Sequence, residues 1–302
     1  MLSEVFYWLF NMSISASVVG IIILLLGKIK KFPRRLIHIL WAIPLLRMWI
    51  SVGITSKYSL MALISKFTTK TVVLYDGTLD FAVTNHIMAV DRYSPIYYKS
   101  NMLDSLFHIA STVWVIVAVA LLVVSIILYF ITKSELKDAS HMQDNIYVSD
   151  RITAPATYGV FRPRIIIPKG YKIRGLDYIL MHESAHIHRK DNLWRIIAII
   201  SASFHWFNPF VWLFLKKFLE ETELACDERV LANCGEDEKK AYALALVDCA
   251  ESKNVFASAF GGAKIRVRID SILSYRKLSI ISTISFVVFA IAIGYLLLTN
   301  AS

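Results

Sequence analysis

The sequence predicts an α-helical membrane protein with four transmembrane helices and a mixed α/β domain on the cytoplasmic side. Hydrophobic residues make up 56% of the 302 residues and charged residues only 19%, a balance typical of membrane proteins. Several apolar segments have the roughly 20 residues that a helix needs to cross a bilayer. The net charge of +10 includes two basic clusters beside these segments, which is typical of charges that set membrane orientation and not of nucleic-acid binding.

The apolar segments divide the chain into five predicted regions. These are two N-terminal spans, an extracellular loop, a third span, a cytoplasmic domain, and a fourth span with a short outer tail: residues 1–54, 55–106, 107–132, 133–277 and 278–302. The second N-terminal span, Leu36–Ile54, contains Pro44 and Arg47. Because an arginine inside a span is costly, we expect Arg47 to pair with another helix or to reach the membrane surface.

Basic residues predict the orientation of these spans. Five cations lie between the first two apolar segments and five more precede the last one: Lys28, Lys30, Lys31, Arg34, Arg35, Lys264, Arg266, Arg268, Arg276 and Lys277. Cytoplasmic loops carry an excess of Lys and Arg, so both clusters belong in the cytoplasm. The prediction is a multi-pass cell-membrane protein with both termini outside and the lipid bilayer as a partner. Three cysteines without a disulfide framework fit a reducing compartment.

The motif HESAH at residues 182–186 dominates the predicted cytoplasmic domain. It lies on a predicted helix, Leu176–Lys190. Residues four apart share one face of a helix, so His182 and His186 can present two imidazoles to one Zn²⁺. The ion lowers the pKa of a coordinated water, and Glu183 can accept the proton and pass it to the leaving amine of a cleaved peptide. A chance H-E-x-x-H occurs roughly once in a hundred such sequences, so context must support it.

A third protein ligand is needed, with one position left open for water. A second predicted helix, from about Val211 to Cys234, offers five acids: Glu220, Glu221, Glu223, Asp227 and Glu228. Glu223 and Asp227 are four apart, so both can face the site, one as ligand and one as supporting acid. The spacing favours Glu223 without deciding among its neighbours.

The chain between His186 and Glu223 is apolar enough to cross the membrane, which would separate the two halves of this site. A single crossing would put them about 30 Å apart on opposite faces of the bilayer. Asn208 and Pro209 offer a resolution, because proline ends a helix and Asn-Pro favours a turn. Two arms of about 22 Å then bring Glu223 back to the level of His186. The sequence predicts a membrane-associated helical hairpin over residues 193–223.

Other residues near the motif are expected to be structural. His188 is expected at the surface or beside a ligand, His205 near the hairpin tip, and Cys226 as a buried small residue and not a nucleophile. The aromatic and β-branched run Tyr158–Pro168 predicts a short hairpin or edge strand. Within it, Arg164–Ile167 is either an edge strand that pairs with an extended substrate or an ordinary core strand.

Four motifs in this order resemble the BlaR- and MecR-type family of beta-lactam sensor-transducers, which are integral-membrane zinc metallopeptidases. They lie within residues 155–231: TYGVFRPRIIIP, YILMHESAHIHRKD, FHWFNPFVW and ETELACDERVL. The resemblance implies a gluzincin-like fold facing the cytoplasm. It also implies that the third zinc ligand is Glu223, the first acid of E-x-x-C-D, with Asp227 as the accompanying acid.

The best-known family members carry an extracellular penicillin-binding domain with a K-T-G element, which this sequence does not contain. We therefore expect the chain to lack that sensor, so the 55–106 loop, a separate sensor protein or a homo-oligomer would supply the signal. By analogy, the zinc endopeptidase would cleave a cytoplasmic winged-helix repressor, or itself, in signal transduction. The alternatives are a catalytically silent receptor or scaffold and a general membrane quality-control peptidase.

Overall fold

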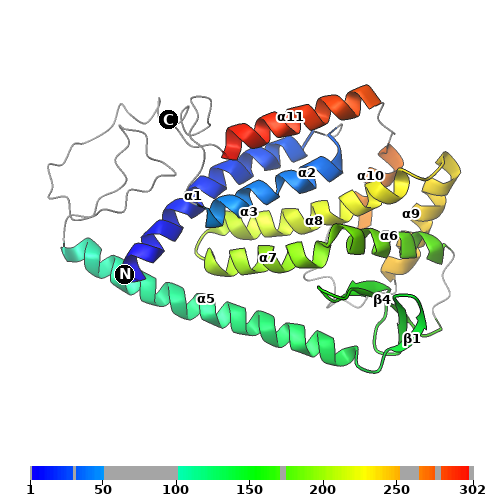
Figure 1. Ribbon diagram of the computed structural model, residues 1–302, viewed down its shortest axis with the longest axis horizontal. Coiled ribbons are helices and arrows are strands. Elements are labelled where there is room, and N and C mark those ends of the chain that lie inside the picture. The colour runs from blue at the N-terminus through cyan, green and yellow to red at the C-terminus, as the bar shows by residue number, and fades with distance from the viewer. Residues whose placement is uncertain are drawn as a thin grey trace.

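The computed structural model describes residues 2–29, 32–50, 101–170, 175–251, 265–275 and 280–298. Figure 1 shows long helices lying lengthwise beside one another, with a small sheet at one end of the molecule. The elements are α1 (Leu2–Gly27), α2 (Arg34–Leu40), α3 (Ala42–Trp49), α5 (Asn101–Glu135), β1 (Ser140–Gln143), β2 (Ile146–Ser149), β3 (Ala156–Tyr158), β4 (Arg164–Pro168), α6 (Leu176–Arg189), α7 (Asp191–Phe204), α8 (Pro209–Leu231), α9 (Glu236–Glu251), α10 (Ile265–Ser274) and α11 (Ile280–Leu298).

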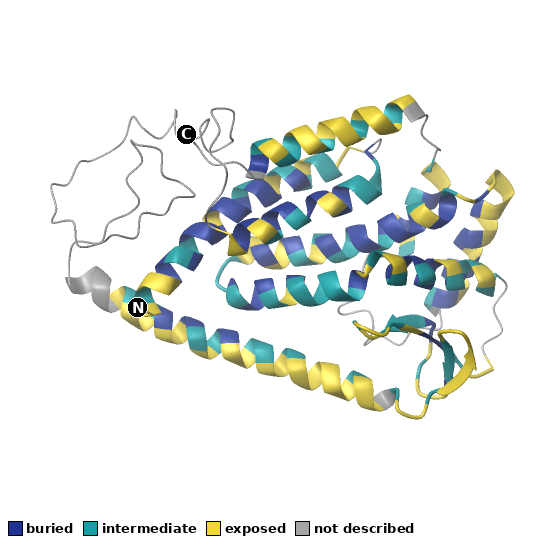
Figure 2. Cartoon of the chain, in the orientation of Figure 1, coloured by how far each residue is buried: buried dark blue, intermediate teal, exposed yellow. Residues whose placement is uncertain are grey.

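Two of the described helices are long and apolar enough to cross a membrane, α1 and the Leu106–Ser134 part of α5. A shorter apolar stretch, Ile281–Leu297, lies in α11. α5 begins before the predicted 107–132 span, and only 6% of its apolar window is buried, so it is exposed along most of its length (Figure 2). The predicted extracellular loop up to residue 100, and the last residues of the span before it, lie outside the described residues.

The predicted second span, Leu36–Ile54, is not one continuous helix. It is divided at Trp41 into α2 and α3. Pro44 lies in the first turn of α3, where it lacks the backbone N–H that would bond the carbonyl of Leu40 and its ring crowds that carbonyl. The described part of this segment therefore consists of two short helices, and the prediction that it crosses the membrane stays a prediction.

Arg47 pairs with another helix, as the sequence predicted. Its side chain is buried, and Nε donates to the carbonyl oxygen of Leu297 at 3.0 Å. Leu297 lies in the last turn of α11, where carbonyls have no partner within the helix. The arginine thus supplies a donor to a helix end and is itself removed from the apolar surface.

α7 and α8 form the helical hairpin that Asn208 and Pro209 predicted. Asn208 is the N-cap of α8, because its side-chain oxygen accepts from the backbone N–H of Phe210 at 3.0 Å. Pro209 occupies the first helical position, where a missing N–H costs nothing. The amide nitrogen of Asn208 donates to the hydroxyls of Ser13 and Ser17, both at 2.7 Å. The turn of the hairpin is therefore fixed against α1.

The other end of α8 is hydrogen-bonded to the two arginines at the start of α2. The carboxylate of Glu228 accepts from the backbone N–H groups of Arg34 and Arg35 at 2.6 and 3.2 Å. These are the first N–H groups of α2, so Glu228 caps that helix from outside its own sequence. Glu221 accepts from Arg34 Nη1 at 3.1 Å. The predicted cytoplasmic loop thus rests on α8.

A four-stranded sheet with the order β1-β2-β4-β3 lies between α5 and α6 in the chain. β2 and β4 are parallel, and the other two pairs are antiparallel. The run Tyr158–Pro168 forms the hairpin between β3 and β4. β4 has a partner on both sides, so the prediction that Arg164–Ile167 is an edge strand is wrong and the core-strand alternative holds. The edge strand on this side is β3.

A separate apolar core lies where α6, α8, α9 and α10 meet. Its large buried side chains include Ile179, Leu231, Tyr242, Leu246 and Ile272. This core fixes α10 against α6 and α8, although α10 lies far from both in the sequence. It therefore brings side chains from the C-terminal part of the chain to the two motif helices.

Gly20 allows α1 to approach α8 closely. A Cβ atom there would lie 2.3 Å from Cε2 of Phe214, a buried ring. We expect Gly20→Ala to lower the free energy of unfolding by about 1–3 kcal/mol, because the ring has no free space to move into. The measurement is thermal unfolding in detergent, followed by tryptophan fluorescence.

The matched control is Gly294→Ala in α11, where a Cβ would lie 3.6 Å from Ile43, an ordinary contact. Phe214→Leu combined with Gly20→Ala should recover part of the loss. Equal unfolding temperatures for the two single variants would contradict the close approach.

Candidate metal centre

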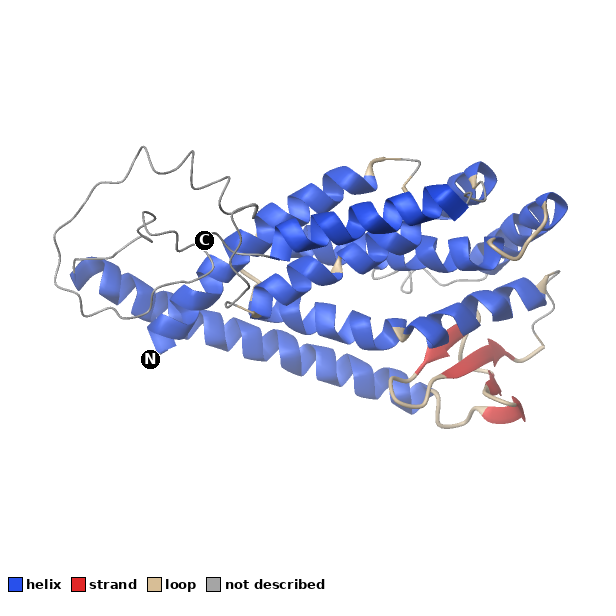
Figure 3. Cartoon of the chain, turned by 45° about the horizontal axis from the view of Figure 1, so that its top comes forward, coloured by secondary structure: helices blue, strands red, loops and turns tan. Residues whose placement is uncertain are grey.

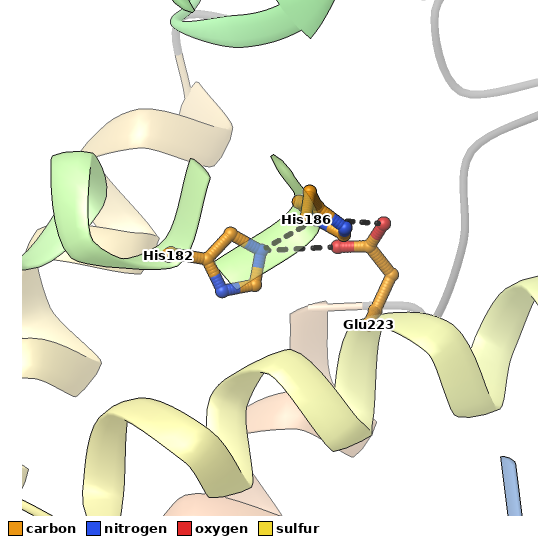
Figure 4. Close-up of side chains that lie close together, drawn as sticks. All are labelled: His182, His186 and Glu223. Carbon is orange, nitrogen blue, oxygen red and sulfur yellow. Dashed lines mark hydrogen bonds and ion pairs between the residues drawn. The ribbon is translucent and has the colours of Figure 1, made fainter. Parts of the chain in front are cut away.

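The two histidines of the motif lie on the buried face of α6. α6 begins after Gly175, whose φ of 80° is left-handed, and ends before Lys190, which has a φ of 55°. His182 and His186 are 3% and 6% exposed, and their Nε2 atoms are 3.2 Å apart. Figure 4 shows both imidazoles directed toward the same point. The helix period alone accounts for this pairing.

Glu223 of α8 completes a group of three side chains that could hold a metal ion (Figure 4). Its Oε2 lies 3.4 Å from Nε2 of His182, and its Oε1 lies 3.7 Å from Nε2 of His186. Ligand atoms on a tetrahedral Zn²⁺, with bonds of about 2.0–2.1 Å, are about 3.3–3.4 Å apart. The three observed separations of 3.2, 3.4 and 3.7 Å are therefore those of one face of such a tetrahedron.

Asp191 holds the outer nitrogen of His186. Its Oδ2 lies 2.7 Å from His186 Nδ1, and the residue is fully buried. The left-handed Lys190 turns the chain sharply, so that Asp191 opens α7 directly beneath α6. A carboxylate on Nδ1 keeps the proton there and leaves Nε2 free to bind a metal. Sequence reasoning missed Asp191, although an acid immediately after the motif helix was a usable signal.

His182 has a corresponding pair of partners on its Nδ1. Asp227 Oδ1 lies at 3.1 Å and the hydroxyl of Tyr242 at 3.0 Å. The same hydroxyl donates to Asp227 Oδ1. The sequence predicted Asp227 as the supporting acid, and the structure places it beside a histidine of the motif. Tyr242, on α9, was not predicted.

Arg268 of α10 offsets the negative charge on this side. Its Nε and Nη2 donate to the two oxygens of Asp227 at 2.8 and 2.6 Å, Nη1 lies 3.3 Å from Glu223 Oε2, and Nη2 lies 3.2 Å from His182 Nε2. Arg195 donates to Glu223 Oε1 at 2.8 Å. Burial alone would raise the pKa of Asp227, but the Arg268 guanidinium holds this pKa well below its ordinary value. Asp227 is therefore an ionised acceptor.

Glu183 lies beside these three candidate metal ligands. Its Oε2 accepts from the hydroxyl of Thr157 at 2.9 Å, so a residue of the edge strand β3 fixes its carboxylate. The carboxylate borders a cavity of ≈ 120 Å³ that is also lined by His182, His186 and Glu223. β3 contributes Thr157 and its neighbour Ala156 to the same cavity, which therefore joins the edge of the sheet to the histidines.

In a comparison with known protein families, the model of the family described as "BlaR1 peptidase M56" matches residues 7–272. This match covers most of the chain. The chain belongs to the BlaR1 peptidase M56 family. The family resemblance inferred from the four motifs is thereby confirmed.

Three regulatory or resistance proteins are similar to this M56 chain. The regulatory protein BlaR1 of Bacillus licheniformis is 29% identical over 160 residues, 49% of this chain and 27% of that protein. BlaR1 of Staphylococcus aureus is 24% identical over 208 residues, 60% and 35% of the two chains. The methicillin resistance protein mecR1 of Staphylococcus epidermidis is 23% identical over 113 residues, 36% and 19%. The similarity thus spans about a third or less of each relative.

The remaining acids of α8 lie away from the M56 motif. Glu221 and Glu228 bind the two arginines that begin α2, and Glu220 pairs with Lys217 at 2.5 Å. These contacts distinguish Glu223 from its neighbours, which the spacing in the sequence did not do.

The histidines and cysteine outside the motif lie where the sequence predicted. His188 is exposed and contacts the carbonyl of Ser184, and His205 is buried at the hairpin turn. Cys226 is fully buried, 3.3 Å from His186 Nδ1. Burial raises the pKa of this thiol well above its ordinary value, so Cys226 stays protonated and is a poor nucleophile.

The ion pair between Arg268 and Asp227 predicts a distinctive pattern of stability. We expect Arg268→Met to lower the free energy of unfolding by about 3–5 kcal/mol, because a buried carboxylate loses its cation. The double variant Arg268→Met/Asp227→Asn should be more stable than Arg268→Met alone. Thermal unfolding in detergent measures both.

Arg266→Met is the control, since Arg266 is an exposed cation on the same helix. The ion pair would lose its assigned importance if Arg268→Met cost no more stability than Arg266→Met.

Proposed function

We propose that the protein is an integral-membrane zinc endopeptidase whose ion is held by His182, His186 and Glu223. The observation that carries this proposal is the spacing of the three ligand atoms, which fits one face of a zinc tetrahedron. The acids on the outer histidine nitrogens support it, because metal-binding histidines almost always donate from their second nitrogen to such a group. The family's description as a peptidase agrees with this chemistry.

Glu183 is the proposed catalytic acid–base. A bound Zn²⁺ would polarise the peptide carbonyl and lower the pKa of a coordinated water. Glu183 faces the cavity and is held by Thr157, so its carboxylate can accept a proton and return it to the leaving amine. Asp227 and Asp191 hold the two imidazoles in the tautomer that leaves Nε2 free. In this proposal Thr157 orients the carboxylate without exchanging protons.

An extended substrate would pair with β3. Among the described strands β3 is the outermost on this side, while β4 is bonded on both sides. Ala156 and Thr157 line the cavity beside Glu183. Strand addition would therefore place the backbone of a bound peptide next to the metal-binding residues. An endopeptidase needs such a site, because the peptide continues on both sides of the cleaved bond.

The proposed topology has four membrane crossings, at residues 1–54 (two), 107–132 and 278–302, with the peptidase in 133–277 facing the cytoplasm and both termini outside. α1 and α5 meet the length and apolarity expected of spans. The contacts of α2 with α8 support placing the basic segment before α2 on the peptidase side. The 193–223 hairpin, whose turn is held against α1 through Asn208, would enter the membrane from the cytoplasmic side.

The proposed role is signal transduction by cleavage of a cytoplasmic regulator of the repressor type, or of the protein itself. It rests on the similarity to proteins described as regulatory. A winged-helix repressor is the proposed substrate and a separate sensor or a second copy of this chain the proposed source of the signal. Cleavage of many unrelated membrane proteins would instead indicate quality control.

The variant Glu183→Gln tests the catalytic proposal. We expect proteolysis to fall by about 10²–10⁴-fold, because an amide cannot accept the proton, while zinc remains bound. The measurements are the zinc content of protein purified in detergent and the proteolysis products in cells, identified by mass spectrometry.

Glu220→Gln is the control, an acid of α8 outside the cavity. If zinc is absent from both the natural protein and the variant, the protein is instead a catalytically silent receptor or scaffold.

Asp191→Asn tests how His186 is held. We expect zinc affinity to fall by about 10–100-fold, the usual effect of removing a carboxylate behind a metal-binding histidine. Competition with a chelator measures it. Asp177→Asn, an exposed acid in the first turn of the same helix as His186, is the control. Unchanged affinity in Asp191→Asn would contradict the role given to this carboxylate.

A further inference from the structure

The turn between β3 and β4, residues 159–163, presents an aromatic ring to the outside of the protein. Phe161 is 94% exposed, the highest value among the exposed large hydrophobic side chains of the described residues. The other highly exposed apolar residues lie mainly on α5 and α11, the helices proposed to face lipid. Phe161 is thus an almost fully exposed aromatic ring outside those helices.

The backbone holds this turn in one shape. Gly159 has a φ of 92°, and a Cβ there would lie 2.8 Å from the carbonyl oxygen of Arg162. The side chain of Asn192, in the first turn of α7, donates to the carbonyl oxygens of Gly159 and Thr157 at 2.8 and 3.3 Å. The turn is thus fastened to the start of the hairpin, and Phe161 is presented from a fixed base.

The depth of this turn follows from the helices beside it. Trp114 of α5 donates to the carbonyl oxygen of Phe204 at 2.7 Å, which sets these two residues at one height. From Phe204 back to Asn192 is about 18 Å of helix. The same distance along the antiparallel α5 reaches Ile126, still about 12 Å short of Ser134, where its apolar stretch ends. The turn therefore lies toward the end of α5 that the proposed topology places on the cytoplasmic side.

The arrangement in space agrees with this count. Figure 3 shows the sheet beside the same end of α5. On that part of α5, Ile126 and Phe130 are 54% and 57% exposed, so the described residues leave its inner half uncovered. In the proposed topology, lipid would cover this part of α5.

The charges around the ring match a membrane surface. Arg162 and Arg164 are exposed on either side of the turn's proline, and no acid occurs between Arg151 and Pro168. An aromatic ring flanked by cations fits the boundary between acyl chains and anionic headgroups on the cytoplasmic leaflet.

We propose that the β3–β4 turn inserts Phe161 into the cytoplasmic leaflet, with Arg162 and Arg164 on anionic headgroups. The inference rests on the proposed topology. It would fasten the substrate-pairing edge strand to the membrane surface, so that peptides near the bilayer reach the cavity first. The partner is the lipid surface itself and not a protein.

The test uses the full-length protein in vesicles of phosphatidylcholine and phosphatidylglycerol. Phe161→Cys is labelled with an environment-sensitive fluorophore, and lipids carrying a nitroxide on the acyl chain are the quencher. Met142→Cys is the matched control, because Met142 is 66% exposed on β1, at the opposite edge of the same sheet. The natural cysteines are all buried, and unmodified protein gives the labelling background.

We expect at least about threefold stronger quenching at position 161 than at 142, with blue-shifted emission. Replacing Arg162 and Arg164 by Gln, or omitting phosphatidylglycerol, should reduce that difference. Equal, weak quenching at both positions overturns the proposal. So does a label at 161 that stays in water until casein peptides are added, since the turn would then contact peptide.

Zinc content measured on the same preparations separates this inference from the proposed function. Strong quenching at 161 supports insertion whether or not zinc is found. Bound zinc with a water-exposed label at 161 overturns insertion and leaves the metal site intact.

Discussion

The hairpin of α7 and α8 is the constraint on which the metal centre depends. The histidines lie before it and Glu223 after it, so its turn sets the height at which the two sides meet. Asn208 fixes that turn twice, through its oxygen on the backbone of α8 and through its nitrogen on Ser13 and Ser17. Both contacts matter in apolar surroundings, where an unpaired amide costs several kcal/mol. A slip of one residue would rotate Glu223 by about 100° away from the histidines.

Charge balance is the second requirement of this buried site. Asp227 is paired with Arg268, Glu223 with both Arg268 and Arg195, and Asp191 lies beside Arg189. An uncompensated carboxylate at such depth would take up a proton and lose its value as an acceptor. The arginines therefore keep the acids ionised and able to hold the imidazoles. Because Arg268 lies on α10, the site depends on the position of that helix. The apolar core around Tyr242 holds α10 in place.

Local patterns in the sequence predicted the parts of this structure that depend on local chemistry. The four-residue spacing of the histidines and the turn at Asn208 follow from helix geometry and from the absence of a proline N–H. Arg268 could not be found in this way, because its partners lie more than 40 residues earlier and only the α9–α10 packing brings it there. The sequence left Arg164–Ile167 open between an edge strand and a core strand, because nothing local shows that β2 pairs with β4 on the side opposite β3. The division at Trp41 was not predicted, although the segment contains Pro44 and a proline disturbs the helix before it.

α8 carries two pairs of acids on opposite faces, since Glu221 and Glu228 are seven residues apart and Glu223 and Asp227 lie about half a turn away from them. The first pair binds Arg34 at the start of α2, and the second pair contacts the histidines. A rigid helix cannot move one pair and leave the other behind. A shift of the membrane segments that displaced Arg34 would alter the reach of Glu223, so the distances at the active centre also measure the position of the helices around it.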